Sequence, residues 1–226
     1  MVALQLAASG GMETIEFEPR RLVIAGWTGR DRATLEAHIR ELEELGVKAP
    51  RSVPLFYCVD HALLSWRATI PVVGRDSTGE AEVVIYKQGG RLLVGLGSDH
   101  TDRALETVGI TLSKQVCAKP VSPQVWAWDD VSEHWDDLQL TSSVPRGAEF
   151  YQRGSVASLR RPDELLALYE QQNGVAPDGF VMFCGTLPVN GGIRFADRFS
   201  AALGDPKLDR ELRLTYDIVA LTVAEA

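Results

Sequence analysis

The chain lacks several features that would place it in a familiar class of protein. It holds only three cysteines in 226 residues, and Cys58, Cys117 and Cys184 are an odd number without metal-like spacing. They fit reduced thiols in a cytoplasm, which is the compartment we predict. No apolar run approaches the roughly 18 to 20 residues that a membrane-spanning helix needs, so we predict no membrane partner.

Excess basic charge is also missing. The chain has 23 Lys and Arg against 31 Asp and Glu, a formal net charge of −8, which disfavours nucleic acid as a partner.

Repeats and low-complexity segments are absent, and the glycines at Asn190-Gly191-Gly192 follow neither the dinucleotide nor the P-loop pattern. The N-terminus has no basic segment typical of a signal peptide. Residues 1–12 are interpreted as a tail compatible with disorder, before a single domain over 13–226.

Within that domain, residues 13–50 are predicted to form a strand and helix extension, and residues 51–226 the core. Leu35, Ile39, Leu42 and Leu45 recur at spacings of three and four and predict an amphipathic helix over Arg32–Leu45. Further helices are expected at Pro162–Tyr169 and, briefly, at Phe195–Leu203. Apolar stretches predict strands at Glu16–Ala25, Leu55–Val59, Thr69–Val73, Gly79–Ile85, Arg91–Gly97, Gln124–Trp128, Leu138–Ser143, Phe180–Cys184, Glu211–Tyr216 and Ile218–Val223. Many short strands with few helices indicate a strand-rich α+β fold.

Three acidic residues stand out around a predicted hairpin. Glu80 and Glu82 are two residues apart on a strand and therefore project from one face. Two like charges on one face repel each other, and a hard divalent cation such as Mg²⁺, Mn²⁺ or Ca²⁺ would remove that repulsion. Asp99, at the end of the partner strand beyond the Gly89-Gly90 turn, could supply a third oxygen ligand. The alternative is a solvated acidic face with Asp99 capping a turn.

Short stretches of the chain resemble, in order, the motifs of the fumarylacetoacetate hydrolase family. Gly79–Ile85 resembles its "yEaElavvig" strand and Ser98–Arg103 its "nDvSaRd" segment. The others are Ser113-Lys114 for "GK", Val121–Pro123 for a Gly-Pro or Ser-Pro pair, Tyr151–Ser155 for "rQ.gnTs" and Cys184–Pro188 for "tGTP". The order holds over about residues 50–190. The sequence around Asp99 and Thr186 resembles even more closely an uncharacterised bacterial branch, which is named only as a domain of unknown function.

The resemblance implies a mixed β-roll with a few short helices, usually a homodimer, and a divalent cation held by Glu80, Glu82 and Asp99. Mg²⁺ is the first expectation, with Mn²⁺ or Ca²⁺ as alternatives. It implies an enzyme that acts on a small carboxylate substrate, a 2-oxo acid or a 1,3-dicarbonyl, through a metal-stabilised enolate in C–C bond hydrolysis. Lys114 and Arg103 match catalytic positions, and Gln152, Gly185 and Thr186 match substrate-binding positions. Tyr57 or Phe56 lies where the family's "P.f.K" strand approaches the substrate, and the lysine of that motif is absent here.

The chain departs from the family's pattern at the base that activates water. Tyr57–His61 resembles the family's "NYxxH" loop only superficially and lies too close to Glu80, so His61 is not expected to be that base. His100 is expected to be a neutral structural histidine. Decarboxylation, isomerisation, hydration or another lyase step therefore remains an alternative to hydrolysis. Two competing hypotheses are a non-catalytic ligand-binding protein on the same fold and a thiol enzyme using Cys184 or Cys117.

Overall fold

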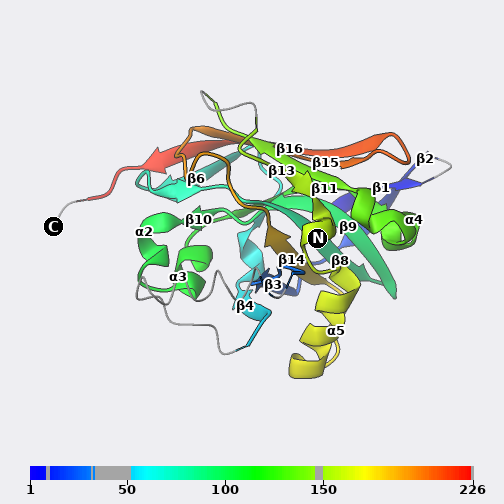
Figure 1. The fold of residues 1–226 in the computed structure, drawn as a ribbon. Helices are drawn as coiled ribbons and strands as arrows, with labels where there is room; N and C mark the ends of the chain where they lie inside the picture. The colour runs from blue at the N-terminus through cyan, green and yellow to red at the C-terminus, as the bar shows by residue number, and fades with distance from the viewer. Residues whose placement is uncertain (9–10, 32, 34–51, 146–149, 225–226) are drawn as a thin grey trace.

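The computed structural model describes residues 1–8, 11–31, 33, 52–145 and 150–224, and it is dominated by two mixed β-sheets (Figure 1). The larger has nine strands in the order β2-β1-β11-β9-β8-β14-β3-β4, with β5 paired to β11. These strands are β1 (Val2–Ala8), β2 (Gly11–Phe17), β3 (Arg21–Gly26), β4 (Leu55–Val59), β5 (Leu64–Ser65), β8 (Ala81–Gln88), β9 (Arg91–Ser98), β11 (Lys119–Ala127) and β14 (Phe180–Thr186).

The second sheet has five strands in the order β13-β12-β15-β16-β6. Its strands are β6 (Thr69–Val73), β12 (Gln139–Ser143), β13 (Gln152–Ser155), β15 (Arg198–Asp205) and β16 (Arg210–Leu221). A small pair joins β7 (Ser77–Thr78) to β10 (Thr101–Asp102). The described helices are α2 (Arg103–Glu106), α3 (Ile110–Gln115), α4 (Trp128–Val131) and α5 (Pro162–Asn173), and the 3₁₀ segments are His61–Leu63, Ser132–Asp137 and Val156–Ser158. The strand-rich α+β prediction is confirmed.

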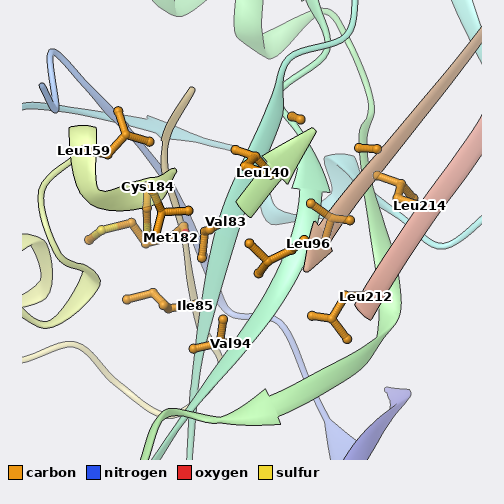
Figure 2. Packing of buried hydrophobic residues seen from close by; sticks show 14 of the residues in the cluster. Val83, Ile85, Val94, Leu96, Leu140, Leu159, Met182, Cys184, Leu212 and Leu214 are labelled. Atoms are coloured by element: carbon orange, nitrogen blue, oxygen red, sulfur yellow. Dashed lines mark hydrogen bonds between the residues drawn. The ribbon is translucent and has the colours of Figure 1, made fainter. Parts of the chain in front are cut away.

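The main hydrophobic core lies between the two sheets. Val83 and Ile85 of β8 and Leu96 of β9 face Leu140 of β12 and Leu212 of β16 (Figure 2). Because side chains alternate along a strand, the intervening apolar residues of β8 belong to a second cluster on the opposite face. This second cluster holds Val84 and Tyr86 with Leu4, Leu6, Phe17, Ile24, Val125 and Phe183. Burial on both faces explains the nearly continuous apolar sequence of β8, β9 and β14.

Two sequence predictions are wrong. The N-terminal segment interpreted as a disordered tail contains β1, which pairs along its length with β2 and places Leu4 and Leu6 in the second cluster. The brief helix expected at Phe195–Leu203 is instead strand β15, in which Phe199, Ala201 and Leu203 point inward with a period of two. The predicted helix Arg32–Leu45 lies outside the described residues, apart from Ala33.

The predicted N-terminal extension contributes directly to the larger sheet, because β3 lies between β14 and β4. None of the helices in the described part of the chain is long and apolar enough to cross a membrane.

Candidate metal and substrate site

The hairpin of β8 and β9 brings the three predicted metal ligands together. The antiparallel register pairs Ala81 with Ser98 and Glu82 with Gly97, and the backbone N–H of Asp99 donates to the carbonyl of Glu80 at 3.0 Å. Each of Glu80, Glu82 and Asp99 offers a carboxylate oxygen, and these oxygens all lie within 4.8 Å of one another. We call these three residues the acidic triad. Glu82 and Asp99 are buried and Glu80 is partly exposed, so the triad opens toward solvent on the side of Glu80.

Each carboxylate of the triad also has a fixed partner in the protein. Glu80 Oε1 pairs with Arg103 Nη2 at 3.0 Å, and Glu82 Oε2 accepts a hydrogen bond from the backbone N–H of Gly185 at 2.8 Å. Asp99 lies between two ammonium groups, since Lys114 Nζ contacts its Oδ2 and Lys119 Nζ lies 2.9 Å from its Oδ1. The contact with Lys119 is an ion pair without hydrogen-bond alignment, which leaves Oδ1 of Asp99 with no aligned donor among the described residues.

Burial and charge pull the pKa values of the triad in opposite directions. Burial, followed by the negative charges of Asp99 and Glu80, raises the pKa of Glu82 well above its usual value. Burial alone would also raise the pKa of Asp99, but the charges of Lys119 and Lys114 outweigh it and lower that pKa. For Lys114, burial favours the neutral amine, yet Asp99, Glu80 and Glu82 outweigh it and raise its pKa. Asp99 and Lys114 are therefore both charged at neutral pH.

Arg103 and Lys114, the two predicted catalytic residues, come from the short helices that follow β10. Arg103 begins α2, where its Nε donates to Thr78 Oγ1 at 2.7 Å and its Nη1 to Glu106 Oε2 at 2.9 Å. The guanidinium is thus held between Thr78, Glu106 and Glu80, and it orients the Glu80 carboxylate. Lys114 lies on α3 with its Nζ 6.0 Å from the ring centre of Tyr57 and 3.9 Å from Glu80 Oε2. Figure 1 shows α2 and α3 beside β10 and β4.

Lys119 was not identified from the sequence. It is the first residue of β11 and is fully buried, and its Nζ also donates to the carbonyl of His100 at 2.5 Å. The available signal was a lysine at the start of an apolar strand, because a buried lysine is almost always paired with an acidic partner. Sequence reasoning does not show which acid that is.

The predicted substrate-binding group Gly185, Thr186 and Gln152 forms a connected network at the end of β14. Thr186 Oγ1 donates to the carbonyl of Ala81 at 2.8 Å and accepts from Gln152 Nε2 at 2.7 Å. Gln152 also donates to the carbonyl of Leu187 and accepts from Ser142 Oγ and the backbone N–H of Ala81. Gln152 is fully buried and all its hydrogen-bonding groups are occupied, so in this structure it supports the site from behind. Thr186 is partly exposed, and its contact with substrate stays a prediction.

The loop after β3, which was not assigned to the site from the sequence, packs against Gly185. The φ angle of Gly185 is +99°, and a Cβ at this residue would lie 1.8 Å from Thr28 Oγ1. Both observations require glycine at this position. Tyr57, which is half-buried on β4, hydrogen-bonds the side chain of Trp27, and burial raises its pKa. Tyr57 thus lies next to both this loop and Lys114, and its contact with substrate stays a prediction.

His100 has the surroundings of the neutral structural histidine that was predicted. His100 is fully buried between the hydroxyl groups of Tyr216 and Ser77, at 2.9 Å from each. Burial, helped by the charges of Lys119 and Arg103, lowers the pKa of His100 to about 3, so the ring is neutral. His61 is an exposed residue of a 3₁₀ segment, 3.7 Å from Asp60.

The thiols argue against cysteine chemistry. Cys58 is exposed, whereas Cys117 and Cys184 are buried. Burial raises the pKa of Cys117 to about 11 and that of Cys184 well above its usual value. Since the thiolate is the nucleophile, neither buried cysteine is activated for reaction at neutral pH.

The acidic triad fits a hard divalent cation. Carboxylate oxygens are the donors that Mg²⁺ and Mn²⁺ prefer, and the triad brings one such oxygen from each of three residues within 4.8 Å of the others. Glu80 and Glu82 each have one oxygen bound to the protein, which leaves the other for a cation. Asp99 differs, because ammonium groups contact both of its oxygens.

Comparisons with known proteins identify the family and the fold. The family described as "Protein of unknown function (DUF2848)" matches residues 25–216. No curated protein matches the chain. A proposed fumarylacetoacetate isomerase/hydrolase from Oleispira antarctica is similar in structure, with a TM-score of 0.67 and 20% identity over 98% of this chain and 100% of that one.

Two further structures have the same fold. One is a 5-carboxymethyl-2-hydroxymuconate delta-isomerase from Mycobacterium smegmatis, with a TM-score of 0.62 and 15% identity over 99% of this chain and 100% of that one. The other is a 2-keto-3-deoxy-D-arabinonate dehydratase in its apo form, with a TM-score of 0.65 and 16% identity over 96% of this chain and 79% of that one. The fold expected from the motifs is thereby confirmed.

Proposed function

We propose, from the premise that this chain belongs to the DUF2848 family and has the fold of the fumarylacetoacetate hydrolase proteins, that it is a divalent-metal-dependent enzyme. Its proposed substrate is a small 2-oxo acid or 1,3-dicarbonyl compound. One observation carries the proposal: Glu80, Glu82 and Asp99 converge at one end of the β8–β9 hairpin, with the ammonium group of Lys114 beside them. Mg²⁺ is the proposed metal, and Mn²⁺ or Ca²⁺ would suit the same oxygen donors.

A cation bound to the triad would act as a Lewis acid that polarises the neighbouring oxygens of the substrate. The chain's own residues would then have separate tasks. Arg103 holds Glu80 in place, and the Gly185 N–H holds Glu82. Lys114 is protonated at neutral pH and lies beside the open edge of the triad, where its ammonium group can stabilise negative charge that develops on a substrate oxygen. Tyr57 and Thr186 would contact the rest of the substrate.

The reaction we test first is C–C bond hydrolysis, with decarboxylation, isomerisation and hydration or dehydration as alternatives. The described residues near the triad supply groups that stabilise negative charge, but His100 is enclosed between two hydroxyl groups and His61 is exposed beside Asp60. The similar structures include both isomerases and a dehydratase by name. Reactions that need charge stabilisation without a histidine base are therefore as well supported as hydrolysis.

A candidate from another class is a ligand-binding protein that does not turn over its ligand. The contacts of Lys114 with Asp99 and Glu80 favour the enzyme, because a buried ammonium group beside a metal site can stabilise negative charge that develops on a substrate. A binding protein would show saturable, metal-dependent affinity for 2-oxo acids without product formation.

We further propose that the enzyme is a cytoplasmic homodimer. The support is an exposed apolar face on the edge strand β6 and the end of β16, formed by Val73, Val219, Leu221 and Val223. Contiguous exposed apolar residues of this kind are typical of association surfaces.

The decisive experiment measures bound metal in the purified protein and then screens 2-oxo acids and 1,3-dicarbonyls with and without EDTA. We expect metal-dependent consumption of at least one compound, lost in Glu82→Gln and kept in Glu16→Gln. Glu16 is an exposed residue of β2, outside the triad, and its substitution removes the same charge. Turnover that EDTA leaves intact would exclude the proposal, and so would an equal loss of activity in both variants.

A further inference from the structure

Asp99 has two ammonium partners whose surroundings differ. Lys119 is the first residue of β11, which pairs with β9 and β5. Its side chain is fully buried, and its Nζ also donates to the carbonyl of His100. Lys114 enters from α3, a six-residue helix, and its Nζ faces Glu80 and the ring of Tyr57, both of which are partly exposed. One ammonium group is therefore enclosed, and the other borders the open side of the triad.

The charges of this cluster nearly cancel without any added ion. Glu80, Glu82 and Asp99 face Arg103, Lys114 and Lys119. Arg103 also pairs with Glu106, which makes four carboxyl groups against three cations. A divalent cation that binds Asp99 must therefore compete with ammonium groups already in contact with both carboxylate oxygens. Two cations at one carboxylate oxygen repel each other even at the effective dielectric typical of proteins, which disfavours their binding to it together.

We infer that Lys119 is a positioning residue that keeps its ion pair with Oδ1 of Asp99, while Oδ2 can exchange Lys114 for a divalent cation. This inference rests on the proposed metal-dependent function and adds a division of roles between the two lysines. Lys119 cannot leave without breaking its bond to the His100 carbonyl and leaving a buried charge unpaired. Lys114 can move instead toward the ring of the half-exposed Tyr57, whose centre lies 6.0 Å from its Nζ. That movement would place its ammonium group on the side from which a substrate enters.

Lys114→Met and Lys119→Met form a matched pair for the test. Each removes one positive charge from one oxygen of Asp99, so a mechanism based on charge alone predicts the same change in cation affinity for both. The exchange mechanism predicts different results. The dissociation constant for Mn²⁺ should fall by on the order of tenfold in Lys114→Met, because the competing ammonium group is gone. It should stay the same or rise in Lys119→Met, where Lys114 still occupies Oδ2 and Asp99 has lost its fixed partner.

Lysine labelling of the wild-type protein gives a second readout that does not depend on the folding of either variant. Acetylation followed by mass spectrometry should show Lys114 becoming several-fold more reactive at saturating Mn²⁺, while Lys119 stays protected with and without the ion. Equal affinity gains in the two variants, or unchanged labelling of Lys114 when titration shows that Mn²⁺ is bound, would overturn the inference and leave the proposed function standing. Absence of Mn²⁺ binding in the wild type and in Lys114→Met would overturn both.

Discussion

Replacing Glu82 by glutamine tests the acidic triad with little change of shape. Glu82 Oε2 accepts a hydrogen bond from the Gly185 N–H, and the amide oxygen of glutamine can accept the same bond. The pKa of Glu82 is raised by burial, with the charges of Asp99 and Glu80 adding to it. An acid whose pKa is higher in the folded than in the unfolded state lowers stability as pH rises above its unfolded value, which is near 4.5. Metal-free Glu82→Gln should therefore match the wild type below that pH and be slightly more stable above it.

Metal should reverse this order of stability. A ligand present at 100 times its dissociation constant stabilises the folded state by about 2.7 kcal/mol. For a chain of this length, 1 kcal/mol shifts the melting temperature by about 2 to 4 °C, so saturating Mg²⁺ or Mn²⁺ should raise that of the wild type by roughly 5 to 10 °C. Glu82→Gln lacks one charged ligand and should lose most of this rise.

The assay is calorimetry of EDTA-treated protein at about pH 4 and about pH 8, below and above the unfolded pKa of the carboxyl group, with and without added metal. Glu16→Gln is the control, because it removes the same charge from an exposed position on β2 and should keep the full metal response. A wild-type melting curve that does not change up to millimolar metal would refute the metal site. A metal response of Glu82→Gln equal to that of the wild type would refute the role of this residue.

Three further predictions address substrate, thiols and assembly. Thr186→Ala should weaken substrate binding by about 1 to 3 kcal/mol, measured by calorimetric titration with Thr186→Ser as the control. Normal binding by a destabilised Thr186→Ala variant would show that the hydroxyl group has a structural role instead. Iodoacetamide should modify the exposed Cys58 much faster than the buried Cys117 and Cys184 and leave activity intact, and inactivation that follows labelling of Cys184 would contradict this expectation. Leu221→Arg should give a monomer by analytical ultracentrifugation, and a wild-type protein that is already monomeric at micromolar concentration would contradict the dimer.

The acidic triad could be predicted because its geometry is local. Glu80, Glu82 and Asp99 belong to one hairpin, whose turn residues Gly89 and Gly90 both have positive φ, at 58° and 74°. Once two adjacent strands join at such a turn, antiparallel pairing places the start of one beside the end of the other. The motif order then identified the fold.

Other features could not be read from local patterns. Phe199, Ala201 and Leu203 alternate as in a strand, but Phe195, Phe199 and Leu203 also recur at a spacing of four, which favours a helix. The strand forms because this segment pairs with β12, which is distant in sequence, and with β16, the next strand along the chain. The N-terminal strand likewise gains its order from β2 and from its parallel contact with β11.

The sequence by itself determined the fold class, the acidic triad and the neighbourhood of Lys114, since each follows from short-range spacing and motif order. Only the tertiary structure decided how the site is held together. It brings the backbone N–H of Gly185 in β14 within hydrogen-bond distance of Glu82 in β8. It also bonds the buried Gln152 to Thr186 and pairs Lys119 with Asp99. The physical reason is that a buried charge or amide is stable only where a partner lies within hydrogen-bond distance, and packing between distant strands decides which partner that is.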